Sequence, residues 1–248
     1  MINKVVGLIP VRLESSRLPG KALAEIHNIP AIVHTYKRAK LSKKLSDLIL
    51  CTDSDEIRQA VSKYDVKVEM TKPHINGSER IYEVSKKYGF RNVLNIQGDE
   101  VLINPNHIDT IIASMEESSE HKFFIGTTNF NKTSEKNVFK AVLNSRDEML
   151  YCSREDIPSP SITKFQDFKK VVFLVGYKDF ALQDFIEWGE CDLETKEPNE
   201  FLRILYNNEK IKAVYLKNAH ISLDTPDDLE VIKRIADTDS LIKLYQKD

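Results

Sequence analysis

Two adjacent carboxylates, Asp99 and Glu100, follow residues 93–96, a short apolar run that is typical of a buried strand. Gly98 stands just before them and leaves room for a ligand beside the backbone. Ligands of open α/β sheets bind at the carboxyl ends of strands, and Mg²⁺ prefers one or two carboxylates together with phosphate oxygens. We therefore expect Asp99 to hold a metal ion that in turn holds a nucleotide. The alternative is that the pair only caps a helix that begins near residues 104–105.

A cationic loop directly follows the first predicted strand. It carries Arg12, Arg17 and Lys21, with Ser15 and Ser16 between the arginines and a Pro-Gly turn before the lysine. Backbone N–H groups and guanidinium groups of such a loop can wrap a polyphosphate. The chain has neither a Gly-x-x-x-x-Gly-Lys-Ser/Thr loop nor a Gly-x-Gly-x-x-Gly loop. The sequence thus predicts a phosphate-binding loop of another kind, and a solvated basic loop is the alternative.

Two further turns lead into predicted helices. Ser78 and the free N–H groups at the helix start can bind a base, a ribose or an anion, or can simply cap the helix. Asp224 precedes a second helix start, which Thr225 caps and in which Pro226 takes the first position. Capping does not require Asp224, so we expect Asp99 and Asp224 to hold one divalent ion together.

Alternating strands and helices must position these residues. Strands are predicted over 5–9, 48–51, 66–70 and 93–96, and helices over 31–40, 55–64, 78–88 and 106–117. The alternation is typical of a three-layer α/β fold with a mostly parallel sheet and right-handed crossovers.

The rhythm changes after residue 117. Strands over 123–129, 138–144 and 171–177 predict an antiparallel extension at about 123–180, and residues 156–170 predict a mobile loop. The last elements are predicted as helices over 180–188 and 200–206, a strand over 211–216 and a helix over 226–235. At 248 residues, we expect one domain spanning 1–248 that contains this extension.

The composition, with 41% hydrophobic and 30% charged residues, is that of an ordinary globular protein. A net charge of −2 favours neither nucleic acid nor a membrane surface as a partner. The first apolar run is too short for a signal peptide, and Cys51, Cys152 and Cys191 have no metal-ligand spacing. We therefore expect a cytoplasmic protein with reduced cysteines.

The motifs together resemble the CMP-Kdo synthetases, which are 3-deoxy-manno-octulosonate (Kdo) cytidylyltransferases. The resemblance rests on residues 9–21, 52–53, 74–80, 95–100 and 224–229 and covers nearly the whole chain in the same order. It implies a Rossmann-like three-layer nucleotidyltransferase fold, a homodimer formed through the antiparallel extension, and Mg²⁺. The implied reaction joins CTP to a sugar acid and gives pyrophosphate and a CMP-sugar. The CMP-sugar serves the biosynthesis of lipopolysaccharide or surface polysaccharide.

The resemblance also implies roles for individual residues. The catalytic set is Arg12, Lys21, Asp99 and Asp224, of which Asp99 and Asp224 hold the metal. The nucleotide-binding set is Pro10, Arg12, Arg17, Lys21, Thr52, Asp53, Asn76, Gly77, Ser78, Arg80, Gln97 and Asp99. The acceptor-binding set is Gln97, Tyr177, Glu197 and Glu200.

Departures from the family pattern cluster in the acceptor half. Val171 and Val175 stand where the family has His and Tyr, Phe201 stands where it has Gln, and Val101 replaces a proline. A site that lacks a matching polar partner discriminates between related substrates. The acceptor is thus Kdo, a modified Kdo, another sugar acid, or a phosphorylated or phosphonylated small molecule. A regulator without turnover, and a transferase for ATP or UTP, are the alternatives of other kinds.

Overall fold

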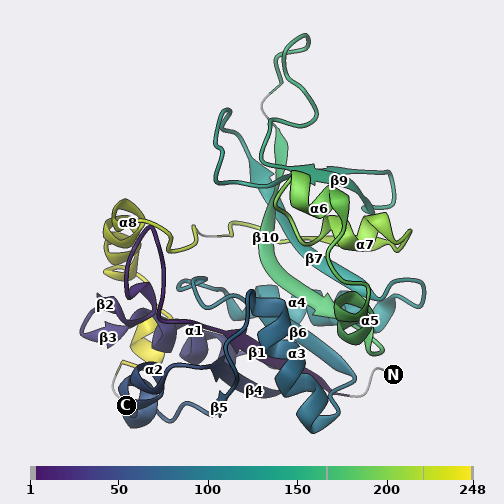
Figure 1. Cartoon of the computed structure of the whole chain (residues 1–248). Helices are drawn as coiled ribbons and strands as arrows, with labels where there is room; N and C mark the ends of the chain where they lie inside the picture. The colour runs from purple at the N-terminus through teal and green to yellow at the C-terminus, as the bar shows by residue number, and fades with distance from the viewer. Residues whose placement is uncertain (1–3, 166, 220, 247–248) are drawn as a thin grey trace.

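Seven strands lie side by side in the central sheet of the computed structural model, which describes residues 4–165, 167–219 and 221–246 (Figure 1). Their order across the sheet is β11 (Ile211–Tyr215), β7 (Phe123–Phe130), β10 (Phe168–Tyr177), β6 (Asn92–Ile96), β1 (Val5–Pro10), β4 (Leu45–Thr52) and β5 (Val68–Met70). β10 is antiparallel to both of its neighbours, and every other neighbouring pair in this order is parallel. The prediction of a mostly parallel sheet is therefore confirmed.

The antiparallel part is continuous with this sheet. β8 (Lys140–Leu143) pairs with β10 and with β9 (Met149–Ser153). Figure 1 shows β7 and β10 rising out of the central sheet toward β9. The predicted antiparallel extension is thus present, but two of its strands also belong to the central sheet. The predicted loop at 156–170 is shorter than expected, because β10 begins at Phe168.

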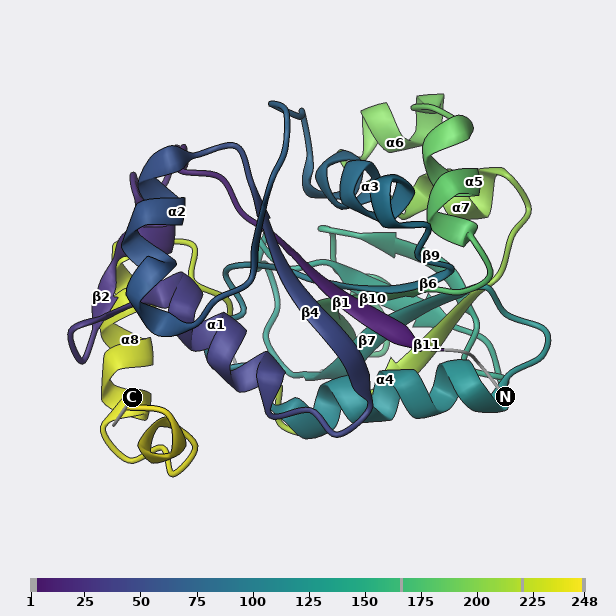
Figure 2. The same cartoon turned by 90° about the horizontal axis from the view of Figure 1, so that it is seen from below.

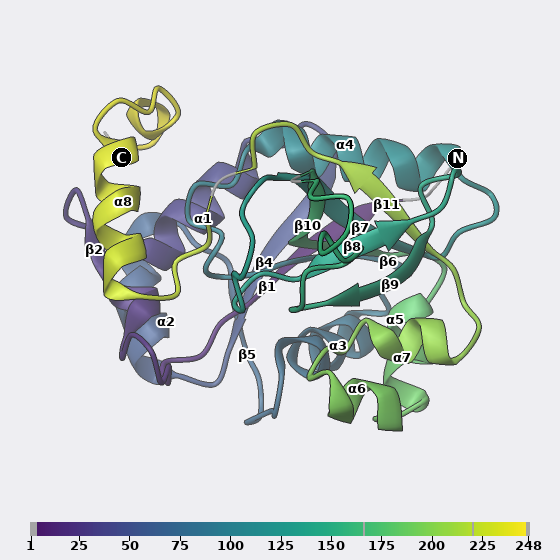
Figure 3. The same ribbon diagram turned by 90° about the horizontal axis from the view of Figure 1, so that it is seen from above.

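Helices cover both faces of the sheet, as Figures 2 and 3 show. One face carries α1 (Ala31–Lys40), α2 (Asp55–Val61) and α4 (Pro105–Glu117), and the other carries α3 (Gly77–Tyr88), α5 (Ala181–Glu187) and α7 (Leu202–Tyr206). Outside these layers lie α6 (Asp192–Lys196), α8 (Pro226–Ala236) and the small hairpin of β2 (Glu25–Ile26) and β3 (Ile29–Pro30). The three-layer architecture is confirmed.

Local signals explain where several helices begin. Ser54 caps α2, because its side chain accepts a hydrogen bond from the N–H of Ile57. Thr225 and Asp228 form a capping box at the start of α8. The predicted helix over 55–64 ends as an α-helix at Val61 and continues as a 3₁₀ turn. β9, α6 and the β2–β3 hairpin were not predicted from the sequence.

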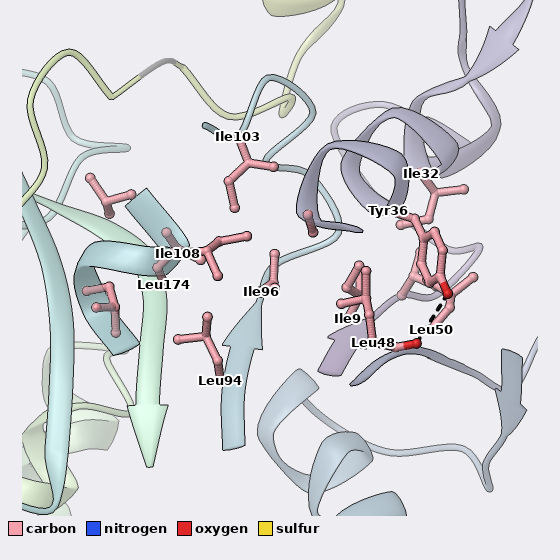
Figure 4. Close-up of a cluster of buried hydrophobic side chains, with 14 of the residues drawn as sticks. Ile9, Ile32, Tyr36, Leu48, Leu50, Leu94, Ile96, Ile103, Ile108 and Leu174 are labelled. Atoms are coloured by element: carbon pink, nitrogen blue, oxygen red, sulfur yellow. Dashed lines mark hydrogen bonds between the residues drawn. The ribbon is translucent and has the colours of Figure 1, made fainter. Parts of the chain in front are cut away.

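Apolar side chains fill the space between the sheet and the face that carries α1 and α4. Ile9 of β1, Leu50 of β4 and Leu94 of β6 are fully buried there, together with Ile32 of α1 and Ile108 of α4 (Figure 4). This packing holds the strand ends in a fixed relation to one another. No helix in the described ranges is long and apolar enough to cross a membrane.

Candidate active site

Three chain segments meet beside Pro10, at the carboxyl end of β1. A Cβ on Gly77, the first residue of α3, would lie 3.0 Å from the Pro10 side chain. A Cβ on Gly98, just after β6, would lie 3.0 Å from the Pro10 carbonyl oxygen. Glycine at both positions lets the backbones approach closely. The ends of β1 and β6 and the start of α3 therefore form one corner of the molecule.

A cavity of about 320 Å³ opens at this corner. The predicted site residues that line it are Pro10, Arg12, Arg17, Lys21, Asn76, Gly77, Arg80, Gln97 and Asp99. The loop between β1 and α1 thus supplies three of the cations, and the first turn of α3 supplies a fourth, Arg80. Gln97 and Asp99 follow the end of β6. Guanidinium and ammonium groups on a cavity of this size suit a nucleotide polyphosphate.

Lys21 joins the two predicted metal ligands. Its Nζ lies 2.6 Å from Oδ2 of Asp99 and 3.1 Å from Oδ1 of Asp224. Arg17 adds a second contact to Asp224, with Nη2 3.0 Å from the same Oδ1 atom. Burial opposes the charged form of Lys21, but the neighbouring carboxylates outweigh it and raise the pKa of the ammonium. Two carboxylates that are 125 positions apart in sequence therefore share one ammonium.

Backbone and side-chain hydrogen bonds hold both carboxylates in place. The N–H of Leu223 donates to the carbonyl oxygen of Asp99 at 2.9 Å, so residue 224 must lie close to residue 99. The hydroxyl of Ser222 donates to Glu100 at 2.7 Å, and Thr35 of α1 donates to the carbonyl oxygen of Gly98 at 2.9 Å. Thr35 and Ser222 therefore position the acidic turn without lining the cavity.

Glu100 differs from Asp99 although the two are adjacent. Its side chain is buried, and burial together with the Asp99 charge raises the pKa of Glu100 to about 7. A buried carboxyl group that accepts from Ser222 is suited to holding the turn. Of these two adjacent carboxylates, Asp99 lines the cavity and Glu100 does not.

Arg80 ties the base of the cavity to the sheet. Its guanidinium lies 3.0 Å from Oδ2 of Asp53 and 2.6 Å from Oγ1 of Thr71, and the residue is only 3% exposed. Asp53 and Thr52, both predicted to bind nucleotide, do not line the cavity. Asp53 instead fixes Arg80, and buried Thr52 accepts from the N–H of Ser54.

A family model for cytidylyltransferases matches residues 6–211, which is most of the chain. The chain belongs to the cytidylyltransferase family. It is therefore a nucleotidyltransferase enzyme, as the motifs predict. The 3-deoxy-manno-octulosonate cytidylyltransferases of Chlorobium limicola and Geotalea uraniireducens are 34% and 35% identical to it. Each alignment covers 94% of this chain, with 97% of the Chlorobium protein and 99% of the Geotalea protein.

Solved structures of cytidylyltransferases have the same fold. A CMP:2-keto-3-deoxy-manno-octonic acid synthetase in complex with CTP superposes with a TM-score of 0.90 at 30% identity, covering 95% of this chain and 99% of that one. A cytidylyltransferase from Leptospira borgpetersenii, at 17% identity and a TM-score of 0.65, shares the fold. The resemblance to the CMP-Kdo synthetase family is thus confirmed over nearly the full length of both chains.

The predicted acceptor residues lie on several elements. Gln97 lines the cavity, whereas Tyr177 is only 1% exposed, with its hydroxyl facing Ser78 and Asn95. Glu200 accepts from the hydroxyl of Ser78 at 3.0 Å. Glu197 accepts from the hydroxyl of Ser153 at 2.7 Å and from the N–H of Arg154 at 3.1 Å. Apart from Gln97, none of the four predicted acceptor residues lines the cavity.

Several lining residues were not among the predicted site residues. They are Val11, Glu14, Ser15, Ser16, Ala22, Ala31, His74, Ile75, Gly98 and Leu223. Most are sequence neighbours of predicted residues, so adjacency is the signal that identifies them. Ala31 has no such signal, because only the packing of α1 against the strand ends brings it to the cavity.

The residues present fit a divalent cation that arrives with a nucleotide. Asp99 and Asp224 each place a carboxylate oxygen within 3.1 Å of the same atom, Nζ of Lys21. The described part of the chain contains no group of three or more His, Cys, Asp or Glu that could hold a metal. Mg²⁺ is usually bound by one or two carboxylates plus phosphates, not by a full cage of protein ligands. The donor set therefore suits a metal whose shell a nucleotide completes.

Proposed function

We propose that this enzyme transfers the cytidylyl group of CTP to Kdo, with Mg²⁺ as cofactor. The observation that carries the proposal is the meeting of Asp99 and Asp224 on one ammonium, beside a cavity that Arg12 and Arg17 line. The fold shared with a synthetase in complex with CTP supports the choice of nucleotide. The names of the curated relatives support the choice of acceptor.

In the proposed reaction an acceptor hydroxyl oxygen bonds to the α-phosphorus of CTP. The bond from this phosphorus to the bridging oxygen breaks, pyrophosphate leaves, and the hydroxyl proton is released. Arg12, Arg17 and Lys21 orient the triphosphate and neutralise the charge of the leaving pyrophosphate. Mg²⁺, held by Asp99 and Asp224, would add positive charge at the phosphates.

A modified Kdo or another sugar acid is the second candidate acceptor. Val171, Val175 and Phe201, which replace polar residues of the family pattern, belong to one buried apolar cluster and are each at most 2% exposed. This cluster has no polar side chain to offer a sugar hydroxyl at those positions, and an unpaired buried hydroxyl costs about 1–3 kcal/mol. The observation favours an acceptor with fewer polar contacts there.

A pyrophosphate-release assay with CTP and Mg²⁺ tests both candidates. The acceptors are Kdo, modified octulosonates, other sugar acids, and phosphorylated or phosphonylated small molecules. Kdo as the best substrate by kcat/KM supports the first candidate and rules out the second. If no acceptor of the panel supports pyrophosphate release, the proposal is contradicted. A thermal-shift comparison of CTP with ATP and UTP tests the base.

We also propose a homodimer formed through the antiparallel extension, and a cytoplasmic location. Leu150 of β9 and Ile162 are 58% and 90% exposed in this part of the chain, and large exposed apolar side chains mark interaction sites. β9 pairs only with β8 among the described strands, which leaves one of its edges available. Free thiols at all three cysteines support a reducing compartment.

A further inference from the structure

All three N–H groups of the Lys21 ammonium have protein acceptors. They are Oδ2 of Asp99 at 2.6 Å, Oδ1 of Asp224 at 3.1 Å and the carbonyl oxygen of Leu223 at 3.2 Å. An ammonium has three donors and no more. In this arrangement Lys21 has no N–H left for a phosphate oxygen, although its side chain lines the cavity that the nucleotide is proposed to fill.

The two carboxylates face the same restriction. A divalent cation bound directly to Oδ2 of Asp99 and Oδ1 of Asp224 would lie next to the ammonium that contacts these two atoms. Two like charges at such a distance repel strongly in a partly buried site, and the Lys21 side chain is only 23% exposed. Lys21 and a metal ion therefore compete for the same oxygens.

We propose that Lys21 exchanges partners when a metal–nucleotide complex binds. The ammonium leaves Asp99 and Asp224 for the phosphates, and the metal takes over the two carboxylates. Each half of the exchange supplies what the other removes, since the nucleotide gives Lys21 new acceptors and the metal gives the carboxylates a new cation. The protein alone then binds metal weakly, and metal and CTP strengthen each other's binding by the same factor.

This inference rests on the proposed function, because it takes Asp99 and Asp224 as metal ligands. It adds that Lys21 couples the binding of the metal to the binding of CTP. Phosphate binding by Lys21 alone does not require this coupling. Arg17 provides a matched comparison. It contacts Asp224 only, at 3.0 Å, and its side chain is 50% exposed, so it blocks the metal much less.

Binding of Mn²⁺, a magnetic substitute for Mg²⁺, measures the coupling directly. Free Mn²⁺ is followed by electron paramagnetic resonance with wild-type, Lys21→Met and Arg17→Met proteins, with and without CTP and with no acceptor. Methionine matches the unbranched apolar stem of the lysine side chain and removes its ammonium group. We expect Lys21→Met to raise the Mn²⁺ affinity of the CTP-free protein at least about tenfold and to lower the strengthening by CTP. Arg17→Met should change this affinity less than threefold.

The outcomes distinguish a failure of the partner exchange from a failure of the proposed metal site. Unchanged or weaker Mn²⁺ binding by CTP-free Lys21→Met overturns the exchange. The metal site itself still stands if Asp99→Asn, with Lys21 unchanged, abolishes the Mn²⁺ binding that the wild-type protein shows in the presence of CTP. Mn²⁺ binding that survives Asp99→Asn and Asp224→Asn overturns the metal assignment and the exchange with it. Circular dichroism of each variant shows that it is folded, and Lys21→Gln replaces Lys21→Met if the latter is not.

Discussion

The hydroxyl of Ser78, in the first turn of α3, donates a hydrogen bond of 3.0 Å to Oε1 of Glu200, just before α7. It joins the helix whose start borders the cavity, proposed to bind the nucleotide, to the part of the chain that carries the predicted acceptor residues. Tyr177 and Asn95 lie at the same place, and their buried side-chain polar atoms have no hydrogen bond of normal geometry within the described chain. Ser78 and Glu200 therefore meet at a part-buried contact next to the buried Tyr177 side chain.

Glu200 should make the stability of the fold depend on pH. Burial raises its pKa from the usual 4.5 to about 7, so the folded state binds an extra proton between these values. This contribution to stability is fully present below pH 4.5 and is lost as the pH rises through 7. In the wild type, this group should lower the free energy of unfolding by roughly 2 kcal/mol between pH 5 and pH 8. We expect Glu200→Gln to remove this part of the decrease.

Urea denaturation of both proteins at the two pH values measures this difference. Glu187→Gln is the control, because Glu187 is an exposed residue at the end of α5 whose side chain accepts a hydrogen bond from Gln183. A pH dependence that is the same in Glu200→Gln and in the wild type would contradict the assignment.

Asp99→Asn and Asp224→Asn should each lower Mg²⁺-dependent pyrophosphate release at least about 100-fold, since each removes one charge from a two-carboxylate site. The measurement is the initial rate with CTP, Mg²⁺ and the best acceptor of the panel. Asp55→Asn is the matched control, because Asp55 lies in the first turn of α2 and contacts only Arg58 among the described ion pairs. Near-normal rates in either site variant would remove that residue from the metal site.

Arg80→Met should weaken both the fold and CTP binding. The buried guanidinium contacts Asp53 and Thr71 and lines the cavity, so its loss leaves the Asp53 carboxylate without this partner. We expect the free energy of unfolding to fall by about 2–4 kcal/mol. Thermal unfolding with and without CTP separates the two effects, because a purely structural residue would leave the CTP-induced shift in Tm unchanged. Arg58→Met, at an exposed ion pair, should change neither value.

Leu150→Lys should disrupt the proposed dimer. Leu150 is 58% exposed on β9, and a charge there disfavours pairing with another apolar surface or strand edge. Size-exclusion chromatography with light scattering measures the mass of the variant and the wild type. A dimer in both proteins would exclude Leu150 from the interface, and a wild-type monomer would exclude the dimer. Leu244→Lys, at an exposed apolar residue in the C-terminal segment, is the control.

Local sequence determined much of this protein. Apolar runs predict β1, β4 and β6, and the capping residues Ser54 and Thr225 mark the starts of α2 and α8. Both kinds of signal act over a few residues, so they can be seen in the sequence alone. The motif at 95–100 and the cationic loop at 12–21 also predict the nucleotide site, because strand ends and the loops after them meet at one edge of a parallel sheet.

Only the tertiary structure decided which side chains meet. The contacts of Lys21 with Asp99 and Asp224 span 78 and 203 positions, and they depend on the order of strands in the sheet and on the pairing of Leu223 with Asp99. Tyr177 has a polar end that suits a substrate, yet packing places it in the core. Burial and long-range pairing are properties of the whole fold, so no local pattern of residue types can reveal them.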